Sequence, residues 1–309
     1  MTRSSKRKRR IWPWIVGIPA VLLLAVVVYG FIVYKDFTTT LKSTYEPIER
    51  EISGKRDVPV KFSDKDPFSV LLLGIDNEES DVGRSDTMIM MAVNPEKKST
   101  KMVSIPRDTY TEIIGRGYKD KINHAYAFGG VEMAMETTEN LLDIPVDYVV
   151  QVNMKSFKDI VDAVGGVDVN NTLDFSQNGH QFNKGNIHLN GEEALAYVRM
   201  RKKDPNGDFG RQDRQKQVIQ AIMREGASVS SIFNYKDIFN TISDNIRTNI
   251  TFDEMVEMQK NYRSAVDTVD QMYFKQGQGQ MMDGIWYYTL NDGELNEIKS
   301  ALKEHLAIN

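Results

Sequence analysis

Carboxylates and arginines alternate in three short polar segments of the chain. The first ends in Asp76, the second is "GRSD" with Arg84 and Asp86, and the third is "PRD" with Arg107 and Asp108. Mg²⁺ prefers one or two carboxylates together with phosphate oxygens, and guanidinium groups bind phosphate through paired hydrogen bonds. These residue types therefore suit a divalent cation bound to a phosphate ester. The alternative is that they form ordinary loop ion pairs, which contribute little to stability.

A second charged segment runs from Tyr197 to Gln215 and reads "YVRMRKKDPNGDFGRQDRQ". From Arg199 to Lys216 the chain has seven basic and three acidic residues, a local charge of +4, although its formal net charge is -4. Such segregation of charge favours an anion-binding site.

The arginines of this segment fall on two predicted helices. Arg199 and Arg201 lie at the C-terminal end of the first helix, where the helix dipole favours cations in any protein. Arg211 and Arg214 lie in the first turn of the next helix, where the dipole disfavours them. The helix dipole therefore explains the positions of Arg199 and Arg201 but not those of Arg211 and Arg214.

Helical spacing indicates where Arg211 points. It shares one face of the predicted helix with Gln215, Val218 and Ile222. Since Val218 and Ile222 must face a core, Arg211 and Gln215 are expected to point inward as well. An inward arginine at a helix N-terminus is costly unless an anion meets it there, which predicts phosphate binding.

Three apolar runs predict the strands that position the first group of charges. They are "FSVLLLGID", "TMIMMAVN" and "KMVSIP", and continuous apolar runs are typical of strands covered on both faces. The polar link "NPEKKST" predicts a hairpin between the second and third strands. An up-down-up meander brings the three charged segments to one rim of the sheet, where α/β proteins bind ligands.

Helices and further strands alternate along the rest of the chain. Strands are predicted at "DYVVQV" and "VDVN", and "MYFK" and "IWYYTL" are expected to complete the sheet. Helices are predicted in residues 131–144, 156–164, 192–201, 211–225, 251–267 and 295–306. This alternation predicts a layered α/β/α domain with a central mixed sheet flanked by helices, in residues 67–309.

The N-terminal sequence predicts a single transmembrane helix. Six of the first ten residues are Lys or Arg, and residues 11–34 contain no charged side chain. At about 1.5 Å per residue, this apolar run is long enough to cross a hydrocarbon core of roughly 30 Å.

The distribution of basic residues predicts the orientation of this helix. By the positive-inside rule, residues 1–10 are a cytoplasmic basic tail, residues 35–66 an extracellular stalk, and the domain that follows is extracellular. This predicts a single-pass type II protein of the cell membrane. A cleaved signal peptide is the alternative, but the apolar run is longer than usual and no A-x-A-like site follows it.

The sequence lacks the signatures of several common sites. It has no P-loop, no G-x-S-x-G turn and no cysteine, and its four histidines lack metal-ligand spacing. Membrane topology explains the basic tail, so no nucleic-acid partner is expected.

Seven segments occur in a characteristic order between residues 68 and 217: "LLLGID", "GRSDT", "SIPRDTY", "KINHAYAFGG", "VGGVDV", "LNGEEALAYVRMRK" and "DFGRQDRQ". With the N-terminal anchor, they resemble the LytR-CpsA-Psr family of cell-envelope proteins. The resemblance implies a phosphotransferase that moves an anionic glycopolymer, such as wall teichoic acid, from an undecaprenyl-diphosphate carrier to peptidoglycan, at the muramic acid 6-hydroxyl.

The resemblance also implies roles for individual residues. Asp76 and Asp86 would hold Mg²⁺ or Mn²⁺, and these two carboxylates with Arg107 and Arg211 would form the catalytic set. The residues that would bind the diphosphate substrate are Arg84, Arg107, Lys121, Asn123, Arg199, Arg201, Arg211, Arg214 and Gln215.

Two other functions are compatible with the same residues. A polyprenyl-diphosphate hydrolase would use water as the acceptor, and a non-catalytic envelope protein would bind the diphosphate without turnover. A cytoplasmic tail of ten residues leaves no room for a DNA-binding domain, so direct control of transcription is not expected.

Overall fold

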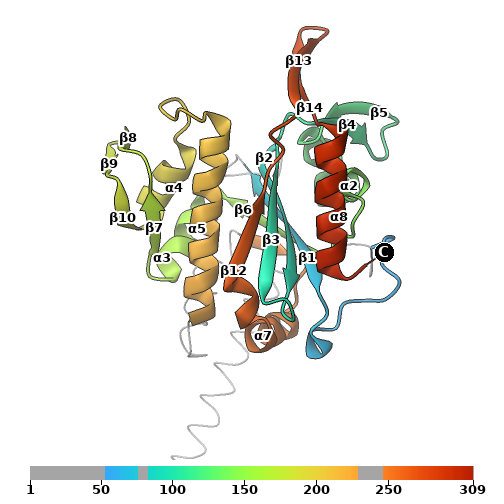
Figure 1. The fold of residues 1–309 in the computed structure, drawn as a ribbon, viewed down its shortest axis with the longest axis horizontal. Coiled ribbons are helices and arrows are strands. Elements are labelled where there is room, and N and C mark those ends of the chain that lie inside the picture. Colours follow the sequence, from blue (N-terminus) through green and yellow to red (C-terminus); the bar gives the residue numbers. More distant parts are fainter. Residues whose placement is uncertain (1–52, 76–82, 229–245, 309) are drawn as a thin grey trace, which may run out of the picture.

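The computed structural model describes residues 53–75, 83–228 and 246–308. Its centre is a six-stranded mixed sheet with the order β11-β6-β1-β2-β3-β12 (Figure 1). The strands are β1 (Phe68–Ile75), β2 (Ser85–Asn94), β3 (Ser99–Ile105), β6 (Tyr148–Asn153), β11 (Ile246–Thr248) and β12 (Thr268–Met272). The antiparallel pairing of β1 with β2 and of β2 with β3 confirms the predicted meander.

Helices cover both faces of this sheet, as alternating strands and helices require. On one face lie α2 (His124–Leu142) and α8 (Asp292–Leu306), and on the other lie parts of α5 (Asp208–Ser228) and α7 (Phe252–Asn261) (Figure 1). The predicted layered α/β arrangement with a central mixed sheet is therefore confirmed within the described residues.

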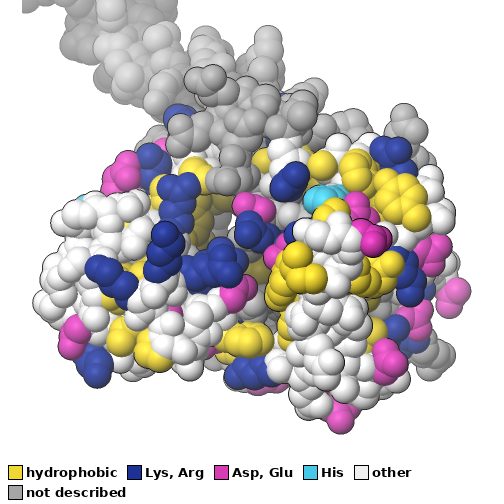
Figure 2. All heavy atoms as spheres, turned by 90° about the horizontal axis from the view of Figure 1, so that it is seen from above, with side chains coloured by type: hydrophobic (Ala, Val, Ile, Leu, Met, Phe, Trp, Pro, Cys, Tyr) yellow, Lys and Arg dark blue, Asp and Glu magenta, His cyan; other side chains and the backbone are white. Residues whose placement is uncertain are grey.

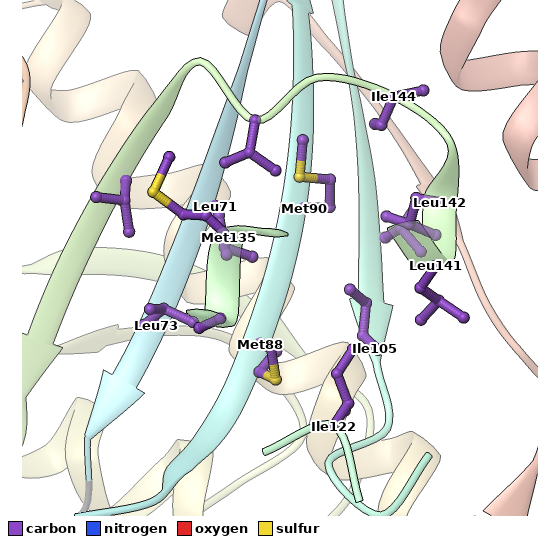
Figure 3. Packing of buried hydrophobic residues seen from close by; sticks show 14 of the residues in the cluster. Leu71, Leu73, Met88, Met90, Ile105, Ile122, Met135, Leu141, Leu142 and Ile144 are labelled. Carbon is purple, nitrogen blue, oxygen red and sulfur yellow. The ribbon is translucent and has the colours of Figure 1, made fainter. Parts of the chain in front are cut away.

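The core between the sheet and α2 consists of long aliphatic side chains. Leu71, Leu73, Met88 and Met90 project from β1 and β2 toward Met135 of α2, and all five are almost completely buried (Figure 3). The neighbouring positions on these strands face α5 and α7, which explains why the strands are apolar on both sides.

A smaller unit packs on the outer side of α5. It contains α3 (Met154–Ala163), α4 (Gly191–Arg199) and two hairpin-like sheets formed by β7 (Val167–Asn171) with β10 (Gly185–Leu189) and β8 (Phe175–Gln177) with β9 (His180–Phe182). Val218 and Ala221 of α5 are buried in its core, while Ile219 and Met223 pack toward the sheet. Thus α5 is a shared wall between two cores.

The remaining strands form two hairpins outside the central sheet. One consists of β4 (Tyr110–Ile113) and β5 (Tyr118–Lys121), and the other of β13 (Gln278–Met282) and β14 (Ile285–Thr289). The prediction that "IWYYTL" completes the central sheet is therefore wrong, because the Asp283-Gly284 turn folds this strand back onto β13.

The last strand of the sheet also starts earlier than "MYFK" predicts. It ends at Met272, after which Phe274 is buried and the backbone N–H groups of Lys275 and Gln276 donate to Glu294 of α8. The chain thus leaves the sheet to pack against α8. The predicted helix 251–267 is also interrupted, since α7 ends at Asn261 and a 3₁₀ turn, η2 (Arg263–Val266), follows.

Part of the predicted stalk packs against the domain. Phe62, in the 3₁₀ turn η1 (Phe62–Asp64), is buried against Phe68 and Tyr262, and the Arg56 guanidinium pairs with Asp147. Residues 53–66 therefore belong to the folded unit. None of the described helices has the length and apolarity to cross a bilayer; the predicted anchor, residues 11–34, lies outside the described residues.

Candidate phosphate-binding site

The meander places the predicted charged segments at one rim of the sheet. β1 ends there, β2 begins there with Ser85 and Asp86, and β3 ends there just before Arg107. A bulge at Gly74 and Ile75 shifts the register, so that Gly74 packs against Thr87 while Ile75 pairs with Ser85. Viewed from this end, Lys and Arg side chains gather around a hollow, with acidic side chains among them (Figure 2).

Asp86 and Arg107 form an ion pair across β2 and β3. Arg107 Nη1 lies 2.9 Å from Asp86 Oδ1, and its Nε lies 3.7 Å from Asp108 Oδ2. Burial disfavours the charged guanidinium, but Asp86, Asp108 and Asp208 outweigh this effect, so that the pKa of Arg107 is raised. Arg107 therefore remains a fixed cation at the rim.

The N-terminus of α5 brings a second guanidinium to the same place. Arg211 Nη2 lies 2.7 Å from Asp208 Oδ1 in the first turn of the helix. Burial lowers the pKa of Arg211; Asp208 raises it, and the nearby cations Arg201 and Arg107 lower it further. Segments about one hundred residues apart in sequence thus place like charges within reach of each other, which an anion would stabilise.

Several buried atoms at the site lack hydrogen-bond partners among the described residues. They include the Arg211 Nε donor, the Asn123 Oδ1 acceptor and the Ser85 hydroxyl. Buried polar groups in native proteins nearly always have a partner, so an orphaned donor such as Arg211 Nε at a charged rim indicates a place for a ligand or water. The prediction that Arg211 points inward is confirmed by its side chain, which is only 20% exposed.

The other predicted binding residues lie around this centre. Gln215 Nε2 donates to Thr87 Oγ1 over 3.3 Å, linking α5 to β2. Lys121 Nζ lies 2.7 Å from Asp108 Oδ1, and the N–H of Asn123 donates to the Arg107 carbonyl. These contacts connect the start of α2 to the end of β3.

Three further predicted arginines are exposed. Arg84 directly precedes β2, Arg199 ends α4 and contacts Met154 of α3, and Arg201 Nε lies 3.6 Å from Asp208 Oδ1. The Asp208 carboxylate thus lies between Arg201 and Arg211. Sequence reasoning did not include Asp208 in the site, although its spacing of three residues from Arg211 in a first helical turn was a usable signal.

Arg214 does not point into this cluster. Its guanidinium is buried, pairs with Asp204, and donates to the carbonyls of Tyr197 and Met200. All three nitrogens are thus engaged by the α4–α5 connection. The structure therefore does not bring Arg214 together with the other predicted binding residues; its contacts are those of a residue that fixes the connection carrying Arg199 and Arg201.

Comparison with known proteins identifies the family. The LytR_cpsA_psr family matches residues 31–304. The chain belongs to this family. It is 50% identical to the Bacillus licheniformis polyisoprenyl-teichoic acid--peptidoglycan teichoic acid transferase TagU over 301 residues, which cover 97% of each chain.

Solved structures of LytR_cpsA_psr proteins have the same fold. Bacillus subtilis TagU superposes with a TM-score of 0.64 at 53% identity, over 78% of this chain and 97% of that one. A structure of TagT bound to LI-WTA superposes with a TM-score of 0.70 at 34% identity, over 84% of this chain and 98% of that one.

Only one of the two carboxylates predicted to hold a metal in this LytR_cpsA_psr protein lies among the described residues. Asp76 lies outside the described residues, whereas Asp86 is at the rim with its side chain 32% exposed. Among the described residues, no three His, Cys, Asp or Glu side chains form a metal-sized group. The described residues therefore do not enclose a metal ion by themselves. Asp86 nevertheless supplies one hard oxygen ligand, and Mg²⁺ usually takes its remaining ligands from phosphate and water.

Proposed function

We propose that this protein is a phosphotransferase that moves an anionic glycopolymer, such as wall teichoic acid, from an undecaprenyl-diphosphate carrier to peptidoglycan. The observation that carries the proposal is the meeting of Arg107 and Arg211, from distant segments, around Asp86 and Asp208. The names of close relatives give the substrate class, a polyisoprenyl-linked teichoic acid and peptidoglycan.

The charges of the site match those of a diphosphate ester. Arg107 and Arg211 are held by carboxylates that fix their orientation, and Arg84, Arg199 and Arg201 surround them at the surface. Phosphoryl transfer needs little covalent help from a protein, since positioning and charge neutralisation supply most of the acceleration. Fixed guanidinium groups supply both.

The reaction is a substitution at the phosphorus that carries the polymer. The muramic acid 6-hydroxyl forms a new P–O bond, the bond to undecaprenyl phosphate breaks, and that phosphate leaves with the electron pair. Arg107 and Arg211 stabilise the negative charge that develops on the transferred and leaving groups. The acceptor proton passes to a carboxylate, for which Asp86 and Asp76 are the candidates.

A divalent cation fits the donors of this site. Asp86, together with Asp76, would hold Mg²⁺ or Mn²⁺, which when bound neutralises phosphate charge during transfer. We expect chelation with EDTA to abolish turnover and added Mg²⁺ to restore it. Retention of full activity in EDTA after removal of bound metal would refute the metal requirement while leaving the roles of the arginines intact.

The location proposed for the enzyme is the outer face of the cell membrane. Residues 1–10 would be cytoplasmic and residues 11–34 would span the bilayer as a single-pass type II anchor, which holds the domain close to its lipid-linked donor. Protease accessibility of the domain in intact protoplasts tests this orientation.

The activity assay separates transfer from the two alternatives. The full chain in detergent is incubated with a lipid-diphosphate-linked polymer, Mg²⁺ and peptidoglycan. Polymer attached to peptidoglycan supports the proposal, free phosphorylated polymer would assign a hydrolase, and binding without turnover would assign a non-catalytic protein.

A further inference from the structure

The β13–β14 hairpin stands above the rim that carries the site (Figure 1). It displays large apolar side chains to solvent: Met281 is 63% exposed, Ile285 47% and Trp286 45%. Exposed apolar groups that are gathered on one small element commonly mark an interaction surface. The activity proposed above involves an acceptor, and none of the residues assigned so far recognises one.

Gly279 on β13 and Gly277 just before it leave room for aromatic rings of β14. A Cβ on Gly279 would come within 2.6 Å of the Trp286 ring, and one on Gly277 would come within 2.6 Å of the Tyr288 ring. Residues 286 and 288 share one face of the strand, and their ring centroids lie 6.4 Å apart at an interplanar angle of 27°. The two rings form a stacked pair in which Trp286 is exposed, while Tyr288 is partly buried and its hydroxyl donates to the Phe274 carbonyl.

This surface is attached directly to the site. The N–H of Tyr288 donates to the Asp108 carbonyl over 2.8 Å, one residue from Arg107. On the opposite face of β14, Tyr287 packs edge-on against Tyr110 with ring centroids 5.0 Å apart, and its hydroxyl donates to Asp120. The Tyr288 end of this surface therefore adjoins the segment that carries Arg107 and Asp108.

We infer that the β13–β14 hairpin binds the glycan strand of the acceptor, with sugar rings lying on Trp286 and Tyr288. Sugars present C–H groups on their ring faces, which pack on the electron-rich faces of aromatic rings, while their hydroxyl groups remain in water. The inference rests on the proposed function and names the acceptor-binding element of the same site.

Two substitutions test the surface in different ways. Trp286→Ala removes the ring, and Gly279→Ala keeps the ring but adds a Cβ that displaces it. With uncrosslinked strands of alternating N-acetylglucosamine and N-acetylmuramic acid as the acceptor, we expect either change to raise the acceptor KM about tenfold. The KM for the lipid-linked donor and kcat at saturating acceptor should stay within twofold, since Arg107 and Arg211 are untouched.

Tyr118→Ala is the matched control, because Tyr118 is 47% exposed and aromatic but lies on β5, where it packs against Phe128. The acceptor KM of this variant should equal that of the unchanged chain. Equal acceptor KM values for Trp286→Ala and the unchanged protein, or equal losses in Tyr118→Ala and Trp286→Ala, would overturn the inference. Absence of transfer by the unchanged protein would instead refute the proposed function.

A direct binding measurement uses Trp286 as the reporter. The chain has only two other tryptophans, Trp12 and Trp14, so a Trp12→Phe/Trp14→Phe variant of the full chain leaves a single tryptophan, which can be excited selectively over tyrosine. We expect its emission to shift on addition of the glycan strands and to remain unquenched in vesicles of brominated phosphatidylglycerol. Quenching by the brominated lipid without a response to glycan would assign the hairpin to the bilayer and refute our inference.

Discussion

At the scale of single residues, Arg211 and Arg214 have different surroundings although they are three positions apart in one helix. Arg211 carries a buried Nε without a hydrogen-bond partner among the described residues, whereas every nitrogen of Arg214 contacts the protein. The first has donors left for a substrate and the second has none. Their substitutions should therefore affect different properties.

Arg211→Ala should lower turnover by about 10²- to 10³-fold, because it removes a preorganised cation from the developing phosphate charge. Its melting temperature should stay within a few degrees of the parent, since relief of repulsion from Arg107 offsets the lost pair with Asp208. Arg224→Ala, at an exposed position of the same helix, is the control. Turnover above a tenth of the parent rate would exclude a catalytic role for Arg211.

Arg214→Ala should destabilise the domain by about 3 kcal/mol or more, because it leaves the buried Asp204 carboxylate unpaired. Urea denaturation measures this free energy of unfolding. Arg214→Lys retains the charge but cannot make all three contacts, so its free energy of unfolding should lie between those of the parent and Arg214→Ala. If Arg214→Ala has the same free energy of unfolding as the parent but binds the donor more weakly, Arg214 binds substrate as the sequence predicts.

At the scale of elements, α2 positions part of the site through a kink. Gly129 and Gly130 interrupt its helical dihedrals, and Gly130 has φ +64° and ψ −150°, a conformation that only glycine adopts readily. The first turns of α2, which follow Asn123, therefore have a direction different from that of the rest of the helix.

Gly130→Ala should destabilise the domain by about 1 to 3 kcal/mol through backbone strain, and should reduce turnover by displacing Asn123. Gly226→Ala, in the regular part of α5, should instead be neutral or stabilising by up to about 1 kcal/mol. Thermal unfolding and the transfer assay measure both properties. A normal melting temperature for Gly130→Ala would show that the kink tolerates a side chain.

Helix α5 also carries a buried cation that the reaction does not use. Lys216 is fully buried, donates to the Met272 carbonyl over 3.1 Å and lies over the Tyr273 ring. Burial lowers the pKa of Lys216 to about 8. Since an unfolded lysine titrates near pH 10.4, the unfolded chain binds more protons between pH 8 and 10, so this group makes stability rise with pH there.

Lys216→Met should accordingly raise the free energy of unfolding at pH 7 by about 1 to 3 kcal/mol and remove the rise between pH 8 and 10. Lys260→Met, at an exposed position of α7, should change neither the free energy of unfolding at pH 7 nor its rise between pH 8 and 10. Urea titrations at several pH values supply the comparison. Destabilisation of Lys216→Met at pH 7 would mean that the contacts with Met272 and Tyr273 outweigh the cost of burial.

At the scale of the whole molecule, an acidic chain presents a basic site. The formal net charge is -4, yet the rim gathers Lys and Arg side chains (Figure 2). Net charge alone would predict repulsion of a polyanionic donor. The local electrostatic field of the basic rim must therefore control how fast the donor associates with the protein.

The rate of transfer at low donor concentration should therefore fall with added salt, because the Debye length shrinks from about 10 Å at 0.1 M to about 3 Å at 1 M. Arg201→Ala should weaken this dependence, since Arg201 is 55% exposed and lies at the mouth of the cluster. Rates that do not change with salt would indicate that encounter is not electrostatically steered.

The sequence predicts the meander, the covering helices and the meeting of Asp86, Arg107 and Arg211, because each follows from a strong period or from a short connection. It predicts the strand β14 but assigns it to the wrong sheet, since "IWYYTL" has the composition of a strand in either sheet and the Asp283-Gly284 turn pairs it with β13. The contacts of Arg214 could not be predicted either, because helical spacing gives the face of a residue but not whether protein carbonyls already occupy its nitrogens.

The position of α5 between two cores couples binding to global unfolding. Its N-terminal turn holds Arg211, while Val218 and Met223 pack into separate clusters farther along. Neither cluster can open without exposing this helix, so the domain should melt in one transition. A diphosphate analogue that binds only the native state would raise that single midpoint by mass action, which makes the melting curve a screen for inhibitors that needs no lipid-linked polymer.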